Sequence, residues 1–235
     1  MLGPLRAASA ELNVPLDDAA LARFERYLDE VLHWRRRLNI IPTGDAVQIV
    51  NLYSIDALLA LWAADFPQGC RAVDVGSGAG FPGIPMKIAR PDLRITLLEA
   101  SRRRVGFLEH VCAVLTLDDV EIEWVRAEDF GRRSDRRETY DRSVERAAAR
   151  IAAALELCLP LVRVGGAAVF LKGPRAHGEV ARTHPLITGL GGQVISNEIS
   201  ALPTTDNERA VIIVGKVAPT PPLYPRTAGR LGRPP

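Results

Sequence analysis

The spacing of apolar residues changes character once along the chain. Over residues 1–66 apolar side chains recur at three- and four-residue steps, which predicts amphipathic helices. One helix is expected to begin at Asp17 or Asp18, whose carboxylate can cap it, and to end near Leu38. A second helix is expected over residues 45–64. The first segment is therefore predicted to be a helical extension.

Beyond this extension short apolar runs alternate with amphipathic stretches. Strands are expected at residues 71–75, 93–98, 120–126, 140–145, 165–172, 193–200 and 209–217. Helices are expected at residues 83–90, 102–115, 148–162 and 175–190. The alternation predicts an α/β fold with a mostly parallel sheet and helices on both faces. The last two strands follow each other directly, which indicates an antiparallel hairpin at one edge of the sheet.

The C-terminal segment, residues 218–235, differs from both of these parts. It is rich in proline, which excludes a helix or a central strand. From Lys216 onward the chain contains basic residues and no acidic ones. An extended arm of this composition is suited to phosphate contact, and Arg226 is the residue expected to make that contact. We thus expect three parts: residues 1–66, 67–217 and 218–235.

Composition narrows the class of protein. Of the 235 residues 47% are hydrophobic and 25% are charged, which is typical of a globular chain. The net charge of +2 does not by itself indicate a nucleic-acid partner. Cysteines and histidines show no metal-ligand spacing, so we expect no metal, no disulfide framework and a reducing, cytoplasmic location. The sequence shows no signal-peptide pattern and no apolar run of membrane length, so no membrane partner is expected.

A glycine-rich loop is the most informative feature of the chain. The apolar run that ends at Val75 is followed by Gly76, Gly78 and Gly80, a spacing that lets the backbone turn sharply and approach a ligand closely. Glu99 ends the next apolar run, about the distance downstream at which a carboxylate binds ribose hydroxyls. Together these residues indicate a cofactor that contains a nucleoside.

The register of the loop distinguishes between two such cofactors. A dinucleotide fingerprint can be written from Gly78, but the glycine directly after the strand is Gly76. Pro82 and Pro85 remove backbone N–H donors where a dinucleotide needs them for its pyrophosphate. Asp74 would repel a diphosphate, whereas it suits the ammonium group of S-adenosylmethionine. The sequence therefore favours a methyltransferase over a dehydrogenase.

A second acidic motif follows another predicted strand. Residues 126–130, Arg-Ala-Glu-Asp-Phe, come after an apolar run over residues 120–125. In a nucleoside site this loop can present a backbone N–H and a carboxylate to the adenine edge, although a solvated turn is the alternative interpretation. The sequence shows no obvious pattern of a nucleophile with its base.

Several blocks of the sequence resemble the bacterial RsmG family, also called GidB, which methylates guanine N7 in ribosomal RNA of the small subunit. The similarity runs from about residue 20 into the tail. The glycine loop alone is common to many methyltransferases, whereas its continuation Gly-Phe-Pro-Gly-Ile-Pro and the later Lys-Gly and Tyr-Pro-Arg blocks are specific. The matching blocks are residues 73–85, 90–93, 97–99, 103–108, 126–130, 145–147, 171–175 and 224–226.

The resemblance implies a class I, Rossmann-like methyltransferase sheet over residues 67–217, behind the helical extension. It implies S-adenosylmethionine as methyl donor and a guanosine of 16S rRNA in the 30S subunit as acceptor. The residues expected to bind the donor are Asp74, Gly76, Ser77, Gly78, Gly80, Phe81, Glu99, Ala127, Glu128 and Arg146. Those expected to contact RNA are Arg126, Lys172, Arg175 and Arg226.

Guanine N7 carries a lone pair and no proton, so its methylation requires alignment rather than a general base. Arg146 and Lys172 are the residues expected to position guanine or RNA at the reacting centre. The chain departs from the family pattern at Tyr53, Ala57 and Glu145, which places the details of the RNA-facing side in question. A small-molecule methyltransferase and an inactive, donor-binding ribosome assembly factor remain as alternatives. We expect the protein to be a monomer.

Overall fold

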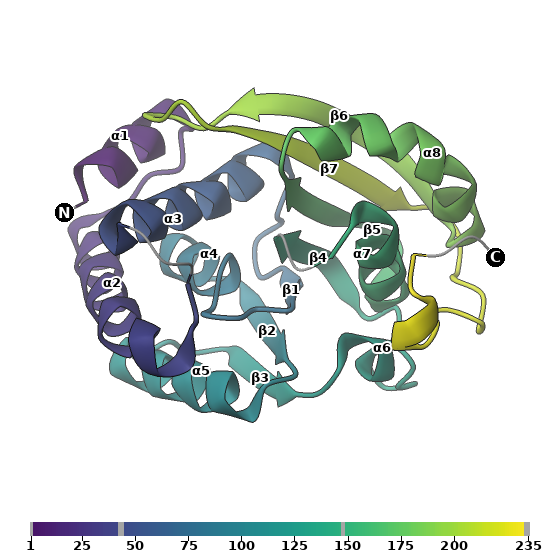
Figure 1. The fold of residues 1–235 in the computed structure, drawn as a ribbon, viewed down its shortest axis with the longest axis horizontal. Coiled ribbons are helices and arrows are strands. Elements are labelled where there is room, and N and C mark those ends of the chain that lie inside the picture. Colours follow the sequence, from purple (N-terminus) through teal and green to yellow (C-terminus); the bar gives the residue numbers. More distant parts are fainter. Residues whose placement is uncertain (1, 42–44, 147–148, 233–235) are drawn as a thin grey trace.

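The protein is built on one seven-stranded sheet with the strand order β3-β2-β1-β4-β5-β7-β6 (Figure 1). The computed structural model describes residues 2–41, 45–146 and 149–232. The strands are β1 (Arg71–Val75), β2 (Arg94–Glu99), β3 (Val120–Trp124), β4 (Tyr140–Arg146), β5 (Val162–Lys172), β6 (Gly192–Ala201) and β7 (Glu208–Lys216). Strands β1 to β5 pair in parallel, and β7 pairs antiparallel with both β5 and β6. The predicted parallel sheet with an antiparallel edge hairpin is confirmed.

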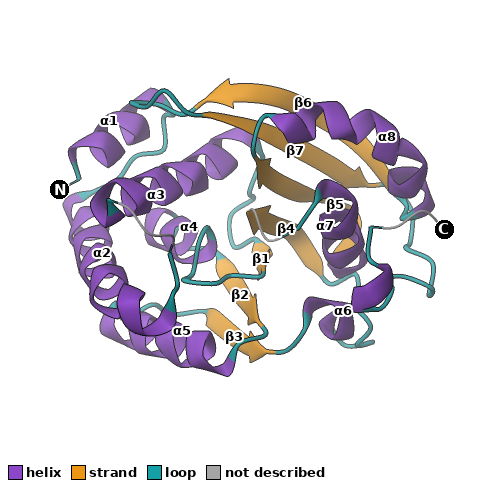
Figure 2. Cartoon of the chain, in the orientation of Figure 1, coloured by secondary structure: helices purple, strands orange, loops and turns teal. Residues whose placement is uncertain are grey.

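Helices cover both faces of this sheet, as Figure 2 shows. They are α1 (Gly3–Glu11), α2 (Asp18–Leu38), α3 (Ala46–Ala63), α4 (Gly83–Ala89), α5 (Arg102–Val114), α6 (Ala127–Phe130), α7 (Ile151–Cys158) and α8 (Arg175–Gly189). Alternate residues of β5 point to opposite faces. Val169 and Leu171 belong to the core under α1 to α5, whereas Ala168 and Phe170 belong to the core under α7 and α8. Because both faces are covered, the central strands are apolar along most of their length.

The N-terminal helices share a core with the sheet. Asp17 caps α2 as predicted, since its carboxylate accepts the Ala20 N–H at 2.7 Å. The short helix α1 was not predicted as a separate element, and its buried Leu5 and Ala8 join the same core. The Tyr27 hydroxyl on α2 donates to the Ala79 carbonyl at 2.7 Å. The helical extension therefore packs directly on the glycine-rich loop.

One predicted helix is too long. The pattern indicated a helix over residues 148–162, but α7 ends at Cys158 and a single 3₁₀ turn, Leu159–Leu161, leads into β5. Pro160 lies in that turn and has no N–H to continue an α-helix. The apolar run on both sides of the proline has no clear periodicity, so pattern alone could not place the boundary.

The C-terminal tail corrects another expectation, because it is folded onto the body rather than extended as a free arm. The Arg137 guanidinium donates to the carbonyl oxygens of Thr220 at 2.6 Å and Tyr224 at 2.7 Å. The Glu138 carboxylate accepts the Thr220 N–H at 2.6 Å and lies 3.0 Å from the Lys216 ammonium. Arg137 and Glu138, in the charged loop before β4, thus hold the tail against the body of the protein.

Arg226 lies at the centre of a second attachment. Its Nε donates to the Glu156 carboxylate at 2.9 Å, and its Nη2 contacts the other oxygen of the same group at 2.5 Å. Glu156 is completely buried and also accepts the Gly232 N–H at 2.8 Å. The sequence predicted that Arg226 contacts RNA phosphate, but in this structure the residue is 91% buried and its guanidinium pairs with the Glu156 carboxylate.

Within the described residues, no helix is both long and apolar enough to cross a membrane.

The tail attachment can be tested by unfolding. Arg226→Ala is expected to lower the free energy of unfolding by about 3–5 kcal/mol, because it leaves the buried Glu156 carboxylate without this cation. Urea titration measures the change. The matched control is Glu156→Leu combined with Arg226→Leu, which removes both charges and is expected to recover most of the loss. An Arg226→Ala protein as stable as the wild type would show that the pair does not secure the tail.

Candidate active site

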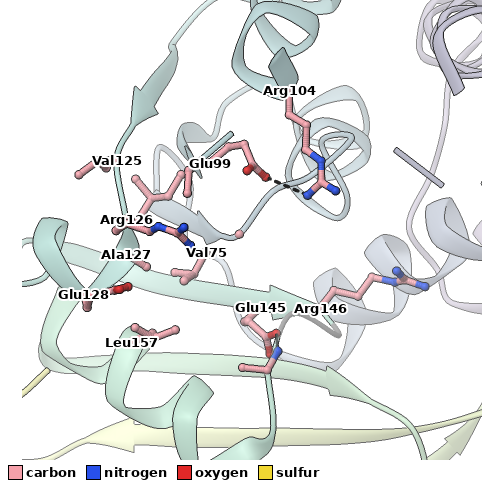
Figure 3. Close-up of a pocket in the computed structure, with 14 residues that line it drawn as sticks. Val75, Glu99, Arg104, Val125, Arg126, Ala127, Glu128, Glu145, Arg146 and Leu157 are labelled. Atoms are coloured by element: carbon pink, nitrogen blue, oxygen red, sulfur yellow. Dashed lines mark hydrogen bonds and ion pairs between the residues drawn. The ribbon is translucent and has the colours of Figure 1, made fainter. Parts of the chain in front are cut away.

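A cleft of about 370 Å³ opens at the carboxyl ends of the central parallel strands (Figure 3). After β1 the chain builds outward through β2 and β3, and then returns to place β4 on the other side of β1. Such a reversal leaves a crevice at the strand ends, where open α/β sheets bind ligands. The cleft is lined by residues that follow β1, β2, β3 and β4, so the fold places it where the glycine loop predicted a ligand.

The glycine-rich loop forms the back of the cleft. Gly76, Gly78 and Gly80 have φ values of 80°, 60° and 97°, in the left-handed region that favours glycine. The N–H groups of Gly76 and Ser77 both donate to the Leu98 carbonyl, at 3.0 and 2.9 Å. A Cβ atom on Gly80 would lie 2.4 Å from the Ile84 side chain, which would have to move, and the positive φ would strain any other residue at this position. Gly76 itself lines the cleft.

Asp74 lies just behind the loop with one carboxylate oxygen in use. Oδ2 accepts the Gly83 N–H at 3.1 Å, while Oδ1 is buried and has no hydrogen-bond partner among the described residues. Burial raises the pKa of Asp74 to about 7, against the opposing effect of the Gly83 hydrogen bond. A buried, unpartnered acceptor oxygen suits an ammonium donor, which would favour the ionised carboxylate. Asp74 is not on the cleft wall, which begins at Val75.

Glu99 joins the end of β2 to the glycine loop. Its carboxylate accepts the Gly78 N–H at 3.0 Å and the Ser101 N–H at 2.7 Å, and Arg104 lies 3.7 Å away. The group is 94% buried and lines the cleft. Each carboxylate oxygen has a further lone pair, so Glu99 can still accept hydroxyl groups while it holds the loop.

The far wall of the cleft combines an apolar slot with a polar rim. Leu98, Val125 and Leu157 provide the apolar surface, and Glu128 and Arg126 lie beside it (Figure 3). The segment predicted as a loop is the short helix α6, which begins at Ala127. A flat heteroaromatic ring with polar edges fits this combination of surfaces, as the motif after β3 predicted.

At the opposite end of the cleft, basic side chains form ion pairs with a buried carboxylate. Arg146, on the cleft wall at the end of β4, has its Nε 2.6 Å from the Asp56 carboxylate of α3. Sequence reasoning placed Arg146 here but did not assign Asp56 or Arg209, whose Nε donates to the same carboxylate at 2.7 Å. In the sequence, Asp56 in the predicted helix over residues 45–64 was the one feature that pointed to this network.

Lys172 was expected to contact RNA, but its side chain lies inside the protein. It is 94% buried, donates to the Ala149 carbonyl at 2.7 Å and pairs with the fully buried Glu145. Glu145 also accepts the Ala149 N–H at 3.2 Å. Glu145 thus supplies a buried partner for Lys172, and the two residues support the chain segment that follows β4.

The remaining predicted residues divide between the loop and the surface. Ser77, Gly78, Gly80 and Phe81 belong to the glycine loop and are not among the residues that line the cleft. Arg126 is exposed on the wall, and Arg175 is exposed at the first residue of α8. Within the part of the chain that is described, no group of three histidine, cysteine or acidic side chains could hold a metal ion.

The fold is that of S-adenosylmethionine-dependent methyltransferases. Fibrillarin from Aeropyrum pernix, solved with natively bound S-adenosyl-L-methionine, superposes with a TM-score of 0.52 at 16% identity, covering 69% of this chain and 76% of its own. TYW2 from M. jannaschii, solved in complex with AdoMet, gives a TM-score of 0.53 at 13% identity over 74% and 76% of the two chains.

Sequence comparison narrows the class to one family. Residues 20–209 match the family model described as GidB, rRNA small subunit methyltransferase G, and the chain belongs to that family. The ribosomal RNA small subunit methyltransferase G of Roseiflexus castenholzii is 43% identical over 91% of both chains. The protein of the same name from Halalkalibacterium halodurans is 39% identical over 93% of this chain and 92% of its own. The family resemblance noted in the sequence is confirmed.

The raised pKa of Asp74 predicts a pH dependence of stability. The folded protein keeps a proton on Asp74 up to about pH 7, whereas the unfolded chain releases it near the ordinary value of 3.8. Between these values the folded state binds more protons, so the contribution of Asp74 to stability falls as pH rises and levels off above pH 7. Asp74→Asn removes this contribution. Urea unfolding at about pH 5 to 8 should give a flatter profile for the variant, and parallel profiles would contradict the raised pKa.

Proposed function

We propose that this protein transfers a methyl group from S-adenosylmethionine to N7 of a guanosine in the 16S rRNA of the small ribosomal subunit. Membership of the small-subunit rRNA methyltransferase G family carries this proposal. The cleft supports it with a carboxylate at the end of β2, an apolar slot and a strongly turned glycine loop. We further propose that it acts as a monomer in the cytoplasm.

Different residues of the cleft would bind different parts of the donor. Glu99 would accept the ribose hydroxyls, and the slot formed with Leu98 and Leu157 would hold the adenine. Asp74 Oδ1 would accept the ammonium group, which requires the loop above it to admit the methionine end. When bound, the donor supplies an electrophilic methyl group on a positively charged sulfur.

The acceptor would need positioning and no proton transfer. Guanine N7 offers its lone pair without deprotonation, so the protein would act by alignment, which can contribute about 7–11 kcal/mol to lowering a barrier. Arg146 is the basic residue on the cleft wall at the acceptor end and would contact the base there. Lys172, which is buried, would act on this end only through Glu145.

The choice of an RNA acceptor rests on the family, because the folded tail no longer provides a phosphate arm. The decisive experiment incubates the protein and labelled donor with unmodified 30S subunits, naked 16S rRNA or free purines. Label at a guanine N7 of the RNA is the expected result. Transfer to free purines alone would favour a small-molecule methyltransferase. Tight donor binding without transfer to any acceptor would favour an inactive assembly factor.

Glu99→Gln is expected to weaken donor binding about 10- to 100-fold, because charged hydrogen bonds contribute about 1.5–3 kcal/mol each and the amide accepts fewer of them. Isothermal titration calorimetry with the donor measures this affinity. Glu109→Gln, an exposed residue of α5, is the control and should bind as the wild type does. Equal affinity of Glu99→Gln and the wild type would remove Glu99 from the donor site.

Arg126 and Arg175 remain as exposed candidates for phosphate contact. Each substitution by alanine is expected to lower the slope of log affinity for rRNA against log salt by about one. Donor affinity should be unaffected by Arg175→Ala, which is outside the cleft. Arg163→Ala is the control, because Arg163 lies near the start of β5, at the end opposite the cleft. Unchanged salt slopes for both variants would place the RNA on another surface.

A further inference from the structure

Two arginines from different strands share one buried carboxylate beside the acceptor end of the cleft. Asp56 of α3 has no exposed surface. Its Oδ2 accepts the Arg146 Nε at 2.6 Å and the Arg209 Nη2 at 3.3 Å, and its Oδ1 accepts the Arg209 Nε at 2.7 Å. Asp56 therefore fixes the edge of the Arg146 guanidinium, while Arg209 limits the rotation of the carboxylate.

The ring of Tyr53 packs against the flat face of the same guanidinium. Asp56 comes three positions after Tyr53 on α3, so both side chains lie on one side of the helix. The Arg146 Cζ is 3.4 Å from the centroid of the Tyr53 ring, well inside the range of about 6 Å for cation–π contact. A carboxylate at the edge and a ring on the face leave the Arg146 group little freedom to tilt or turn.

We propose that Tyr53 and Asp56 are positioning residues that hold Arg146 flat at the cleft wall for the acceptor base. The inference rests on the proposed function, and it makes α3, outside the sheet, a part of the acceptor site. An acceptor site with a fixed guanidinium favours a purine that carries a carbonyl oxygen, because the guanidinium N–H groups can donate to that oxygen.

A purely structural role for Tyr53 makes a different prediction. The Tyr53 ring also packs edge-on against Phe81 of the glycine loop, with centroids 5.3 Å apart. If Tyr53 served only to support that loop, its loss would weaken donor binding. If it positions Arg146, its loss would lower the turnover number and leave donor binding unchanged. The two parameters therefore separate the two roles.

The test compares Tyr53→Leu and Tyr53→Phe with the wild type in methyl transfer to 30S subunits, and measures donor affinity by calorimetry. Tyr53→Leu should lower kcat about 10- to 100-fold, the loss that a displacement of about 1 Å can cause, with donor Kd within about twofold. Tyr53→Phe keeps the ring face and should restore most of kcat. Trp62→Leu, an exposed aromatic residue on the same helix, is the matched control and should leave both parameters unchanged.

Wild-type kcat in Tyr53→Leu would overturn the inference while leaving the proposed function intact. Loss of donor affinity in Tyr53→Leu would also overturn it, by assigning the ring to the glycine loop. Failure of the wild-type protein to methylate any rRNA would overturn the proposed function and this inference together. Asp56→Asn, which retains an acceptor oxygen but no charge, should show the same fall in kcat with unchanged donor Kd, and an unchanged kcat would remove Asp56 from the positioning role.

Discussion

The carbonyl of Leu98 is the point on which the active-site architecture depends. It accepts the N–H groups of two successive residues, Gly76 and Ser77, and thereby bends the chain at the end of β1 toward β2. The carboxylate of Glu99, the next residue, accepts the Gly78 N–H and so adds a third hydrogen bond between the end of β2 and the glycine loop. These bonds turn two neighbouring parallel strands into one wall of a cleft. Without them the glycines would be free to adopt many conformations, and the loop would lack a defined shape.

Around that wall, buried charges hold the parts of the molecule that the sheet does not reach. Asp56 links α3 to β4 and β7, Glu145 with Lys172 supports the segment after β4, and Glu156 secures the tail. Each pair would contribute little to net stability compared with apolar residues of equal volume. Their effect is on geometry, because a buried charge without its partner is costly.

The sequence was informative where the physics is local, and less so where residues distant in the chain meet. The strands and most helices could be predicted because apolar periodicity and glycine spacing are local features, and Glu99 reached the cleft as expected. Arg226 and Lys172 were expected to contact RNA, but both pair with buried acids. A sequence shows that a residue is basic and does not show whether its partner is a phosphate or a buried carboxylate. Their partners, Glu156 and Glu145, lie 70 and 27 residues away, and no pattern in one sequence connects them.

The attachment of the tail has a consequence for synthesis of the protein on the ribosome. Helix α7 is synthesised before the tail, and two of the groups that bind its Glu156 carboxylate come from positions 70 and 76 residues later. A nascent chain that has not yet delivered Arg226 carries an unneutralised acid at a site that the finished fold excludes from water. The second core, under α7 and α8, therefore borders a buried ion pair whose cation joins the chain 70 residues after its acid.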